Sequence, residues 1–250
     1  MSMKNIRAAF RMFLFTVSTI GLHTFWFVTH FFVPNKIHWR QFIFGAWTKS
    51  FVRISHMHIE VIGTPPKPPF FLVTNHLSYT DIGALRAVVK GIFVAKADIN
   101  GWFLAGRICR DMGTIFINRE NRRDIPRAGE EIITRLNAGE GVIVFPEGTS
   151  TKGEAVLPFN SSFLEFAARS KTPVSYASIT YQTPPGEMPA NLAACWWEDI
   201  TFFAHMWRLF KVREYTAVIV FGERPVINPD RKALAAELRD RVAESFAPVE

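Results

Sequence analysis

The sequence is poor in cysteine and, over its first 59 residues, has no acidic residue at all. Its two cysteines, Cys109 and Cys195, are too few for a secreted disulfide scaffold, and no CxxC motif or Cys/His cluster indicates a zinc site. Hydrophobic residues make up 48% of the 250 residues, which is ample for a folded core and excludes a disordered or fibrous chain.

The missing acidic residues give the chain an uneven charge. Residues 1–59 contain seven lysines and arginines, while the other 22 basic residues balance all 22 acidic ones, so the net charge of +7 belongs to one end. The same segment holds ten of the 24 phenylalanines. Because the positive charge is interleaved with Phe and Trp and not spread over a polar face, nucleic-acid binding is disfavoured.

Two apolar stretches occupy this basic segment. Residues 12–33 carry no formal charge, and 22 such residues are enough for a helix to cross a hydrocarbon core. A Pro-Asn pair ends this run, and a second apolar stretch covers residues 37–54. The second stretch has basic pairs at both ends, where long cationic side chains snorkel from a lipid-contacting helix: Lys36/Arg40 and Lys49/Arg53. We therefore expect residues 1–57 to form a membrane-associated segment of two helices.

The topology of this segment stays open at the level of sequence. A cleaved signal peptide is the weaker alternative, because the first run exceeds a usual h-region and no small-x-small cleavage site follows it. Basic residues flank the run on both sides, so the positive-inside rule gives no orientation. A hairpin dipping into one leaflet and a true span are both compatible with the pattern.

From residue 58 onward, short apolar runs alternate with helix-like segments, which is typical of an α/β fold. Strands are expected over residues 58–62, 70–74, 92–95, 114–117, 141–145, 174–181 and 217–221. Helices are expected over residues 81–88, 124–136 (with Asp124 as its cap), 162–168 and 230–246. We predict an α/β domain over residues 58–250, with a mostly parallel central sheet flanked by helices.

A histidine and an aspartate follow the second expected strand, at His76 and Asp81. The carboxyl end of a strand is where α/β folds place ligands. Asp81, in the first turn of the next helix, could reach one imidazole nitrogen and leave the other as a base. The alternative is a helix N-terminal aspartate beside an ordinary surface histidine. Ser78 is interpreted as a turn residue, because no Gly-x-Ser-x-Gly elbow surrounds it.

Three more polar side chains follow expected strands. They are Lys96 after residues 92–95, Arg119 after residues 114–117, and Glu147 after residues 141–145. Taken singly, each is compatible with a surface charge or an ordinary turn. Because the carboxyl ends of parallel strands meet at one edge of a sheet, we expect a base, two cations and a carboxylate to converge there.

These motifs resemble, in order, the blocks of the glycerolipid acyltransferase family, whose type member acylates lysophosphatidic acid. The Asn-His-x4-Asp block is Asn75, His76 and Asp81; the Gly-x-x-Phe-Ile-x-Arg block is Gly113, Phe116, Ile117 and Arg119; the Phe-Pro-Glu-Gly-Thr block is Phe145 to Thr149; a weaker fourth block is Thr172-Pro173-Val174. The aromatic N-terminal stretches are also similar to the membrane-docking helices of that family.

The resemblance implies roles for individual residues. It implies that His76 is a general base oriented by Asp81, and that Lys96 steadies the thioester oxyanion. It also implies a substrate-binding set, with Arg119 on the headgroup phosphate and the others around the glycerol: Asn75, Gly113, Glu147, Gly148 and Thr149. No metal and no cofactor is expected, since acyl-CoA or an acyl-carrier protein would serve as co-substrate.

The predicted activity is transfer of a fatty acyl group from such a thioester to the free hydroxyl of a lysolipid by a membrane-bound O-acyltransferase. The first candidate acceptor is 1-acyl-sn-glycerol 3-phosphate, which would give phosphatidic acid. Many relatives carry an arginine after the third block, where Ser150-Thr151-Lys152-Gly153 follows here, and Asn160 stands where they often have a basic residue. Lyso-ornithine lipid, which lacks phosphate, is therefore the alternative acceptor. A membrane thioesterase or lipase and a non-catalytic membrane module are further alternatives. Because acyl thioesters are made in the cytosol, we expect the bacterial inner membrane, with the catalytic domain facing the cytoplasm.

Overall fold

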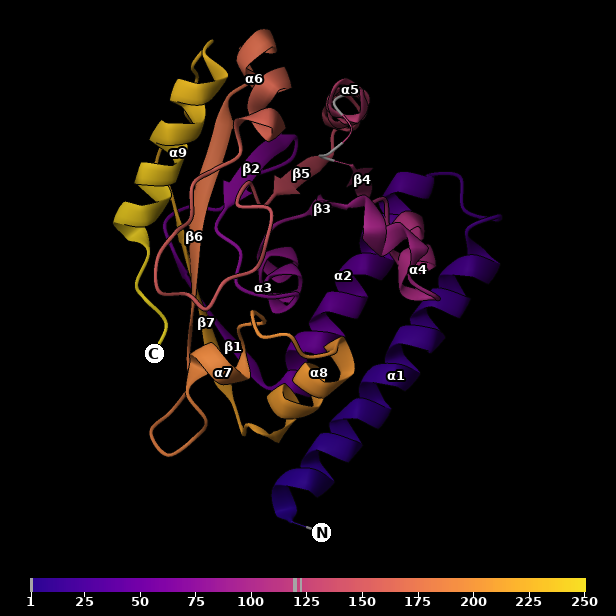
Figure 1. The fold of residues 1–250 in the computed structure, drawn as a ribbon. Helices are drawn as coiled ribbons and strands as arrows, with labels where there is room; N and C mark the ends of the chain where they lie inside the picture. Colours follow the sequence, from indigo (N-terminus) through magenta and orange to yellow (C-terminus); the bar gives the residue numbers. More distant parts are fainter. Residues whose placement is uncertain (1, 119–120, 122) are drawn as a thin grey trace.

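A central β-sheet runs through the part of the chain that the structure describes, residues 2–118, 121 and 123–250 of a computed structural model (Figure 1). Its strands are β1 Met57–Ile62, β2 Phe70–Thr74, β3 Gly91–Lys96, β4 Ile115–Ile117, β5 Gly141–Val144, β6 Val174–Gln182 and β7 Tyr215–Phe221. The helices are α1 Met3–Thr29, α2 Lys36–Ser55, α3 Thr80–Val88, α4 Ala105–Asp111, α5 Asp124–Asn137, α6 Glu165–Ser170, α7 Ala190–Ala193, α8 Phe202–Lys211 and α9 Arg231–Ser245, with 3₁₀ turns at Ala97–Gly101 and Ser161–Leu164. Each expected strand is present, with its bounds within two residues of the prediction.

The sheet is mostly parallel, as predicted. The strands lie in the order β1-β7-β6-β2-β5-β3-β4, and only the β6–β7 pair among them is antiparallel. The four neighbours β2, β5, β3 and β4 share one direction, so their carboxyl ends form one continuous edge. The turns that carry the sequence motifs follow these four strands.

Helices cover both faces of the sheet. Buried residues of α5, α6 and α9 form one hydrophobic cluster, while α2, α3 and α8 contribute to a second cluster on the opposite face (Figure 1). Strand β2 supplies both clusters, with Phe70 and Leu72 on one side and Phe71 and Val73 on the other. A strand buried on both faces reads as a continuous apolar run, which is why the sequence pattern located it so well.

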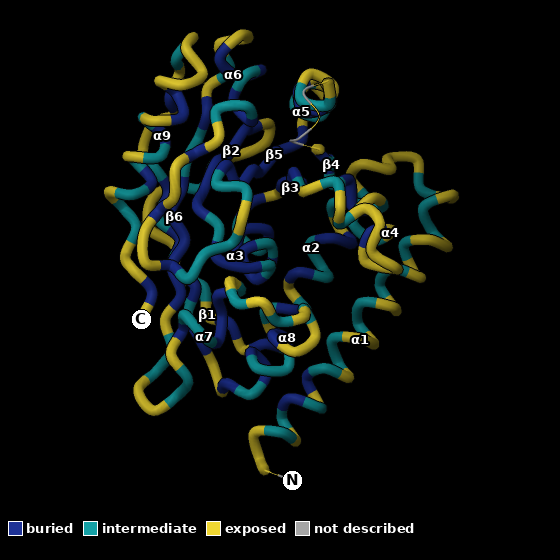
Figure 2. Tube along the Cα trace, viewed as in Figure 1, coloured by how far each residue is buried: buried dark blue, intermediate teal, exposed yellow. Residues whose placement is uncertain are grey.

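Helices α1 and α2 form an antiparallel pair at the edge of the molecule. Two indole N–H groups tie them together: Trp39 donates to Thr29 Oγ1 at 3.0 Å, and Trp47 donates to Thr19 Oγ1 at 2.9 Å. Helix α1 leaves much of its surface exposed along its whole length, whereas the central strands β2 and β5 are buried (Figure 2). By length and composition, α1 is apolar enough to cross a membrane.

Helix α2 differs from the expected lipid-contacting helix. Its buried residues, among them Phe44 and Phe51, cover α3 and the sheet, and a Cβ on Gly83 of α3 would meet the Phe51 ring at 2.5 Å. The sequence predicts that Arg40 snorkels, but its guanidinium instead pairs with Glu140, a carboxylate that is itself buried. Much of the apolar character of α2 therefore serves the protein core.

Candidate active site

The carboxyl edge of β2 holds a hydrogen-bonded histidine and aspartate. His76 Nδ1 lies 2.7 Å from Asp81 Oδ2, and Asp81 is in the first turn of α3. This is the contact that the spacing of the two residues predicts. Since the carboxylate can only accept, Nδ1 carries the proton and Nε2 presents its lone pair. The His76 side chain is 22% exposed, so a reactant can approach it.

Asp81 is completely buried and fully engaged. Its Oδ2 also accepts hydrogen bonds from the backbone N–H groups of Leu77 (2.8 Å) and Ser78 (3.0 Å). Its Oδ1 accepts one from the hydroxyl of Tyr181 at 2.7 Å. Four donors offset the cost of burying a carboxylate, and they fix the oxygen that orients the imidazole.

The turn after β5 clamps the main chain of His76 on both sides. Glu147 Oε2 accepts the backbone N–H of His76 at 2.9 Å, and the backbone N–H of Thr151 donates to the His76 carbonyl at 3.1 Å. Phe145, the first residue of the same turn, stacks on the imidazole with centroids 4.1 Å apart and planes 19° from parallel. The histidine is therefore held by its backbone, its ring face and Nδ1 together.

Glu147 is an unusual carboxyl group. Its second oxygen, Oε1, accepts the backbone N–H of Leu157 at 2.8 Å, so it bridges three segments of chain. Burial raises the pKa of Glu147 to about 7, although the two N–H donors and the neighbouring imidazole favour its charged form. A carboxyl group balanced in this way can change protonation near neutral pH.

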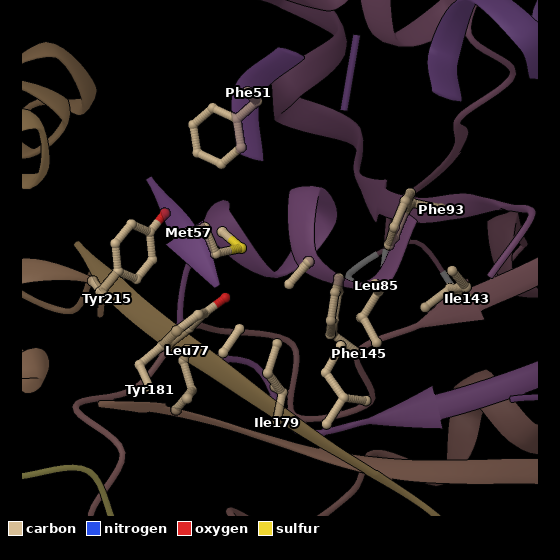
Figure 3. Packing of buried hydrophobic residues seen from close by; sticks show 14 of the residues in the cluster. Phe51, Met57, Leu77, Leu85, Phe93, Ile143, Phe145, Ile179, Tyr181 and Tyr215 are labelled. Atoms are coloured by element: carbon tan, nitrogen blue, oxygen red, sulfur yellow. The ribbon is translucent and has the colours of Figure 1, made fainter. Parts of the chain in front are cut away.

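Phe145 also connects the site to the core. Its ring stacks on Phe93 of β3 at 5.9 Å, and the close-up in Figure 3 shows both rings beside Leu85 and Ile143 in the hydrophobic core. Rigid packing beneath the turn limits the rotamers open to the catalytic candidates.

A segment from α7 to α8 packs over the turn that carries His76. The backbone N–H of Trp196 donates to the Leu77 carbonyl at 2.9 Å. His205 of α8 lies 3.0 Å from the Tyr79 hydroxyl through Nδ1 and 2.9 Å from the Cys195 carbonyl through Nε2. Burial lowers the pKa of His205 to about 4, so it is a neutral structural histidine and not a second base.

Asn75 and Gly113 have clear structural contacts. The Asn75 side chain is buried, and its amide donates to the Ile179 carbonyl and accepts the Ile179 N–H at 2.9 and 2.8 Å, which joins the end of β2 to β6. Gly113, in the turn before β4, has φ +87°, and a Cβ there would lie 2.8 Å from the Arg40 guanidinium. Their substrate-binding roles stay predictions.

The remaining predicted site residues lie at the same edge of the sheet or outside the described residues. Lys96 ends β3 and pairs with Asp98 at 2.6 Å, with both side chains exposed. Gly148 adopts φ +76° in the Glu147 turn, and Thr149 beside it is exposed. Arg119 falls outside the described residues. The structure thus brings His76, Asp81 and Glu147 together, while no contact between described residues joins Lys96 to them.

Tyr181 is the site residue that the sequence analysis missed. It is the second-last residue of β6, and its place near the carboxyl end of that strand was the one available signal. The contacts of Tyr181 and of Glu147 form only when β6, β2 and β5 are neighbours.

This arrangement fits proton abstraction from a hydroxyl by Nε2 of His76, with Asp81 stabilising the imidazolium that results. Ser78 is buried, which does not suit a nucleophile. Among the described residues, no group of three or more His, Cys, Asp or Glu side chains is placed to hold a metal ion.

Comparisons with known proteins agree with this chemistry. The family model described as Acyltransferase matches residues 58–180. A 1-acyl-sn-glycerol-3-phosphate acyltransferase of Neisseria gonorrhoeae is 29% identical over 195 residues, 76% of this chain and 74% of the relative. A lyso-ornithine lipid O-acyltransferase of Rhodobacter capsulatus is 31% identical over 206 residues, 79% of this chain and 73% of the relative.

A solved structure shares the fold. The crystal structure of the 1-acyl-sn-glycerophosphate (LPA) acyltransferase PlsC from Thermotoga maritima superposes with a TM-score of 0.69 at 21% sequence identity. The match covers 96% of this chain and 94% of that one.

Proposed function

Because the chain belongs to the acyltransferase family, we propose that it transfers a fatty acyl group from an acyl thioester to the free hydroxyl of a lysolipid. The observation that carries the proposal is the His76–Asp81 pair, whose Nδ1 is bound and whose Nε2 is the available base. The donor is acyl-CoA or an acyl-carrier protein, and no cofactor takes part.

In the proposed reaction, His76 Nε2 removes the proton from the acceptor hydroxyl as its oxygen attacks the thioester carbonyl. A new C–O ester bond forms, the C–S bond breaks, and the proton passes from His76 to the departing thiolate. A thioester is already activated, so no enzyme nucleophile is needed. General-base assistance of this kind contributes about 10²–10⁴ in rate.

Other residues of the edge position and stabilise the reactants. Glu147 holds the His76 backbone and shapes the acceptor site together with Gly148. Lys96 or backbone N–H groups stabilise the negative charge that develops on the carbonyl oxygen. Asn75, Gly113 and Thr149 complete the proposed binding set.

The proposed acceptor is 1-acyl-sn-glycerol 3-phosphate, with Arg119 on its phosphate, since a guanidinium matches a phosphate bidentately. Lyso-ornithine lipid is the second candidate, supported by relatives of that name. The residues after the Phe-Pro-Glu-Gly-Thr motif also support this acceptor. The Ser150 hydroxyl donates to the Trp196 carbonyl, and Lys152 pairs with Glu154 at 2.7 Å. These residues therefore offer little free charge to a phosphate.

The proposed location is the bacterial inner membrane, with the active site facing the cytoplasm. The exposed apolar surface of α1 supports membrane attachment. The proposed division is an attachment segment, residues 1–57, and an acyltransferase domain, residues 58–250, on which α2 packs. Both lipid substrate and lipid product would then stay at the bilayer.

An assay that pairs labelled acyl-CoA and acyl-acyl-carrier protein with a panel of lysolipids tests the proposal. We expect acceptor-dependent acyl transfer, fastest with lysophosphatidate, and a roughly 10- to 100-fold higher KM for that acceptor in Arg119→Ala. An unchanged KM, with faster transfer to lyso-ornithine lipid, would select the second candidate. Acyl release that needs no acceptor would indicate a hydrolase instead.

A further inference from the structure

A cavity of about 580 Å³ lies away from the catalytic turn, between the first half of α1, the end of α2 and the segment before β7. Four arginines line it, one or two from each of these elements: Arg7, Arg11, Arg53 and Arg213. No residue of the proposed active site is among the lining residues.

The positive charge of this cavity is poorly compensated. Glu214 is the one carboxylate among the lining residues, and it is exposed and 3.2 Å from His58. Arg213 lies 3.3 Å from Glu187, while Arg53 is exposed and forms no ion pair with any described residue. The pKa of His56, also on the wall, is lowered by partial burial and then by Arg11, as expected in a positive environment.

Two of the arginines have a structural role that explains their position. Arg11 donates to the Val212 carbonyl at 2.6 Å and the Arg213 carbonyl at 2.8 Å, and Arg7 donates to the Lys211 carbonyl. These carbonyl groups lie at and just beyond the C-terminus of α8, where cations are favoured. The contacts dock α1 on α8 but neutralise no charge. The side chains of Arg53 and Arg213 have no part in this docking, so they are the ones to test.

The cavity borders an apolar surface. Phe10 and Leu14 of α1 form part of its wall, and Phe10 also belongs to a stripe of exposed apolar side chains. The stripe follows one face of α1 at spacings of three and four residues, and consists of Met3, Ile6, Phe10, Phe13, Val17 and Ile20. A soluble phosphate would use the arginines alone, whereas a phospholipid would use both surfaces.

We propose that this cavity binds the headgroup phosphate of one anionic glycerophospholipid, whose acyl chains lie along the apolar stripe of α1. Arginine forks bind phosphate oxygens bidentately. The bound lipid would hold the basic end of α1 at an anionic membrane, independently of the catalytic turn.

Lipid binding to the full-length protein in a neutral detergent tests this. The probes are dioleoylphosphatidylglycerol, dioleoylphosphatidylcholine and inorganic phosphate, and the readout is the number of retained lipids by native mass spectrometry with the Kd from titration. The variant is Arg53→Gln/Arg213→Gln, and its matched control is Lys90→Gln/Arg224→Gln, which removes two exposed charges elsewhere. A third variant, Glu214→Gln, removes the carboxylate of the wall.

We expect one retained phosphatidylglycerol per chain, with phosphatidylcholine bound at least tenfold more weakly. The Arg53/Arg213 variant should weaken phosphatidylglycerol binding about 10- to 30-fold, roughly fivefold for each arginine near an anionic lipid surface. The control variant should stay within twofold, and Glu214→Gln should tighten binding. Equal losses of phosphatidylglycerol affinity in both double variants would indicate diffuse electrostatic attraction and would overturn the proposed site. Inorganic phosphate that binds as tightly as the lipid would overturn its assignment to a lipid.

Discussion

The hydroxyl of Tyr181 donates a 2.7 Å hydrogen bond to Oδ1 of Asp81, the carboxylate oxygen that does not face the imidazole. Both side chains are fully buried, and burial raises the pKa of Tyr181 well above its usual value. The phenol therefore stays protonated and donates at physiological pH. Through Asp81, a residue of β6 restrains the base in the turn that follows the neighbouring strand β2.

Removing the base or its orienting carboxylate should stop acyl transfer. We expect His76→Ala to lower kcat by about 10²–10⁴. Asp81→Asn should lower kcat by about 10³–10⁴, because an amide in place of the carboxylate favours the wrong tautomer of the imidazole. Thermal unfolding and vesicle binding should show that the His76→Ala protein is folded and membrane-bound. His58→Ala, which removes an exposed histidine, is the control. Substantial residual turnover in His76→Ala would contradict the mechanism.

Tyr181→Phe should lower kcat about 5- to 30-fold with little change in KM, since it frees Asp81 Oδ1 without touching the substrate. The pH profile of kcat should also shift, which a purely structural role would not cause. Tyr215→Phe is the matched control, because Tyr215 is equally buried, lies 6.0 Å from the Tyr181 ring and donates to Ser55 instead. Equal kcat losses in the two variants would exclude a positioning role for Tyr181.

Glu147 should make stability depend on pH. Burial raises its pKa from 4.5 to about 7, so the folded state holds this proton more tightly than the unfolded state. Its contribution to the free energy of unfolding is therefore fully present below pH 4.5 and is lost as the pH rises through 7. We expect the free energy of unfolding of the wild type minus that of Glu147→Gln to fall by about 1–3 kcal/mol between pH 4.5 and 8, measured by urea titration.

Glu154→Gln is the control for that experiment, because Glu154 is exposed and its pairing with Lys152 lies at the surface. Its difference from wild type should stay nearly constant over the same range. A flat difference for Glu147→Gln would mean that the N–H groups of His76 and Leu157 outweigh burial and keep the carboxylate charged.

The exposed stripe of α1 should anchor the protein. Phe13→Ser/Val17→Ser should lower partitioning into phosphatidylcholine vesicles at least tenfold, because these side chains would lose their burial in lipid. Phe203→Ser provides the comparison, since Phe203 is 71% exposed on α8 and outside the stripe. Vesicle flotation measures both. An equal effect of Phe203→Ser would argue against the stripe as the attachment surface.

The sequence predicted the sheet far better than the helices around it. Each strand was expected: β2 and β5 are buried on both faces and form continuous apolar runs, whereas β7 alternates buried and partly exposed residues. Helices α4, α7 and α8 were not predicted, and Asp124 is not a cap. It lies in the first turn of α5, where its carboxylate binds the backbone N–H of Asn118 at 2.6 Å and the guanidinium of Arg127. A short polar side chain such as aspartate can cap a helix or, from the first turn, bind the preceding loop, and the conformation of that loop decides between the two.

The sequence by itself determined the alternation of strands and helices, the apolar N-terminal helix and the local pairing of His76 with Asp81, because burial patterns and contacts over five residues are local. Only the tertiary structure decided that Tyr181, 100 residues away, binds Asp81, and that Glu147, 71 residues away, holds the His76 backbone. It likewise joined Arg11 to carbonyl groups some 200 residues further on. Such contacts depend on the spatial order of strands and helices, which no periodicity along the chain encodes.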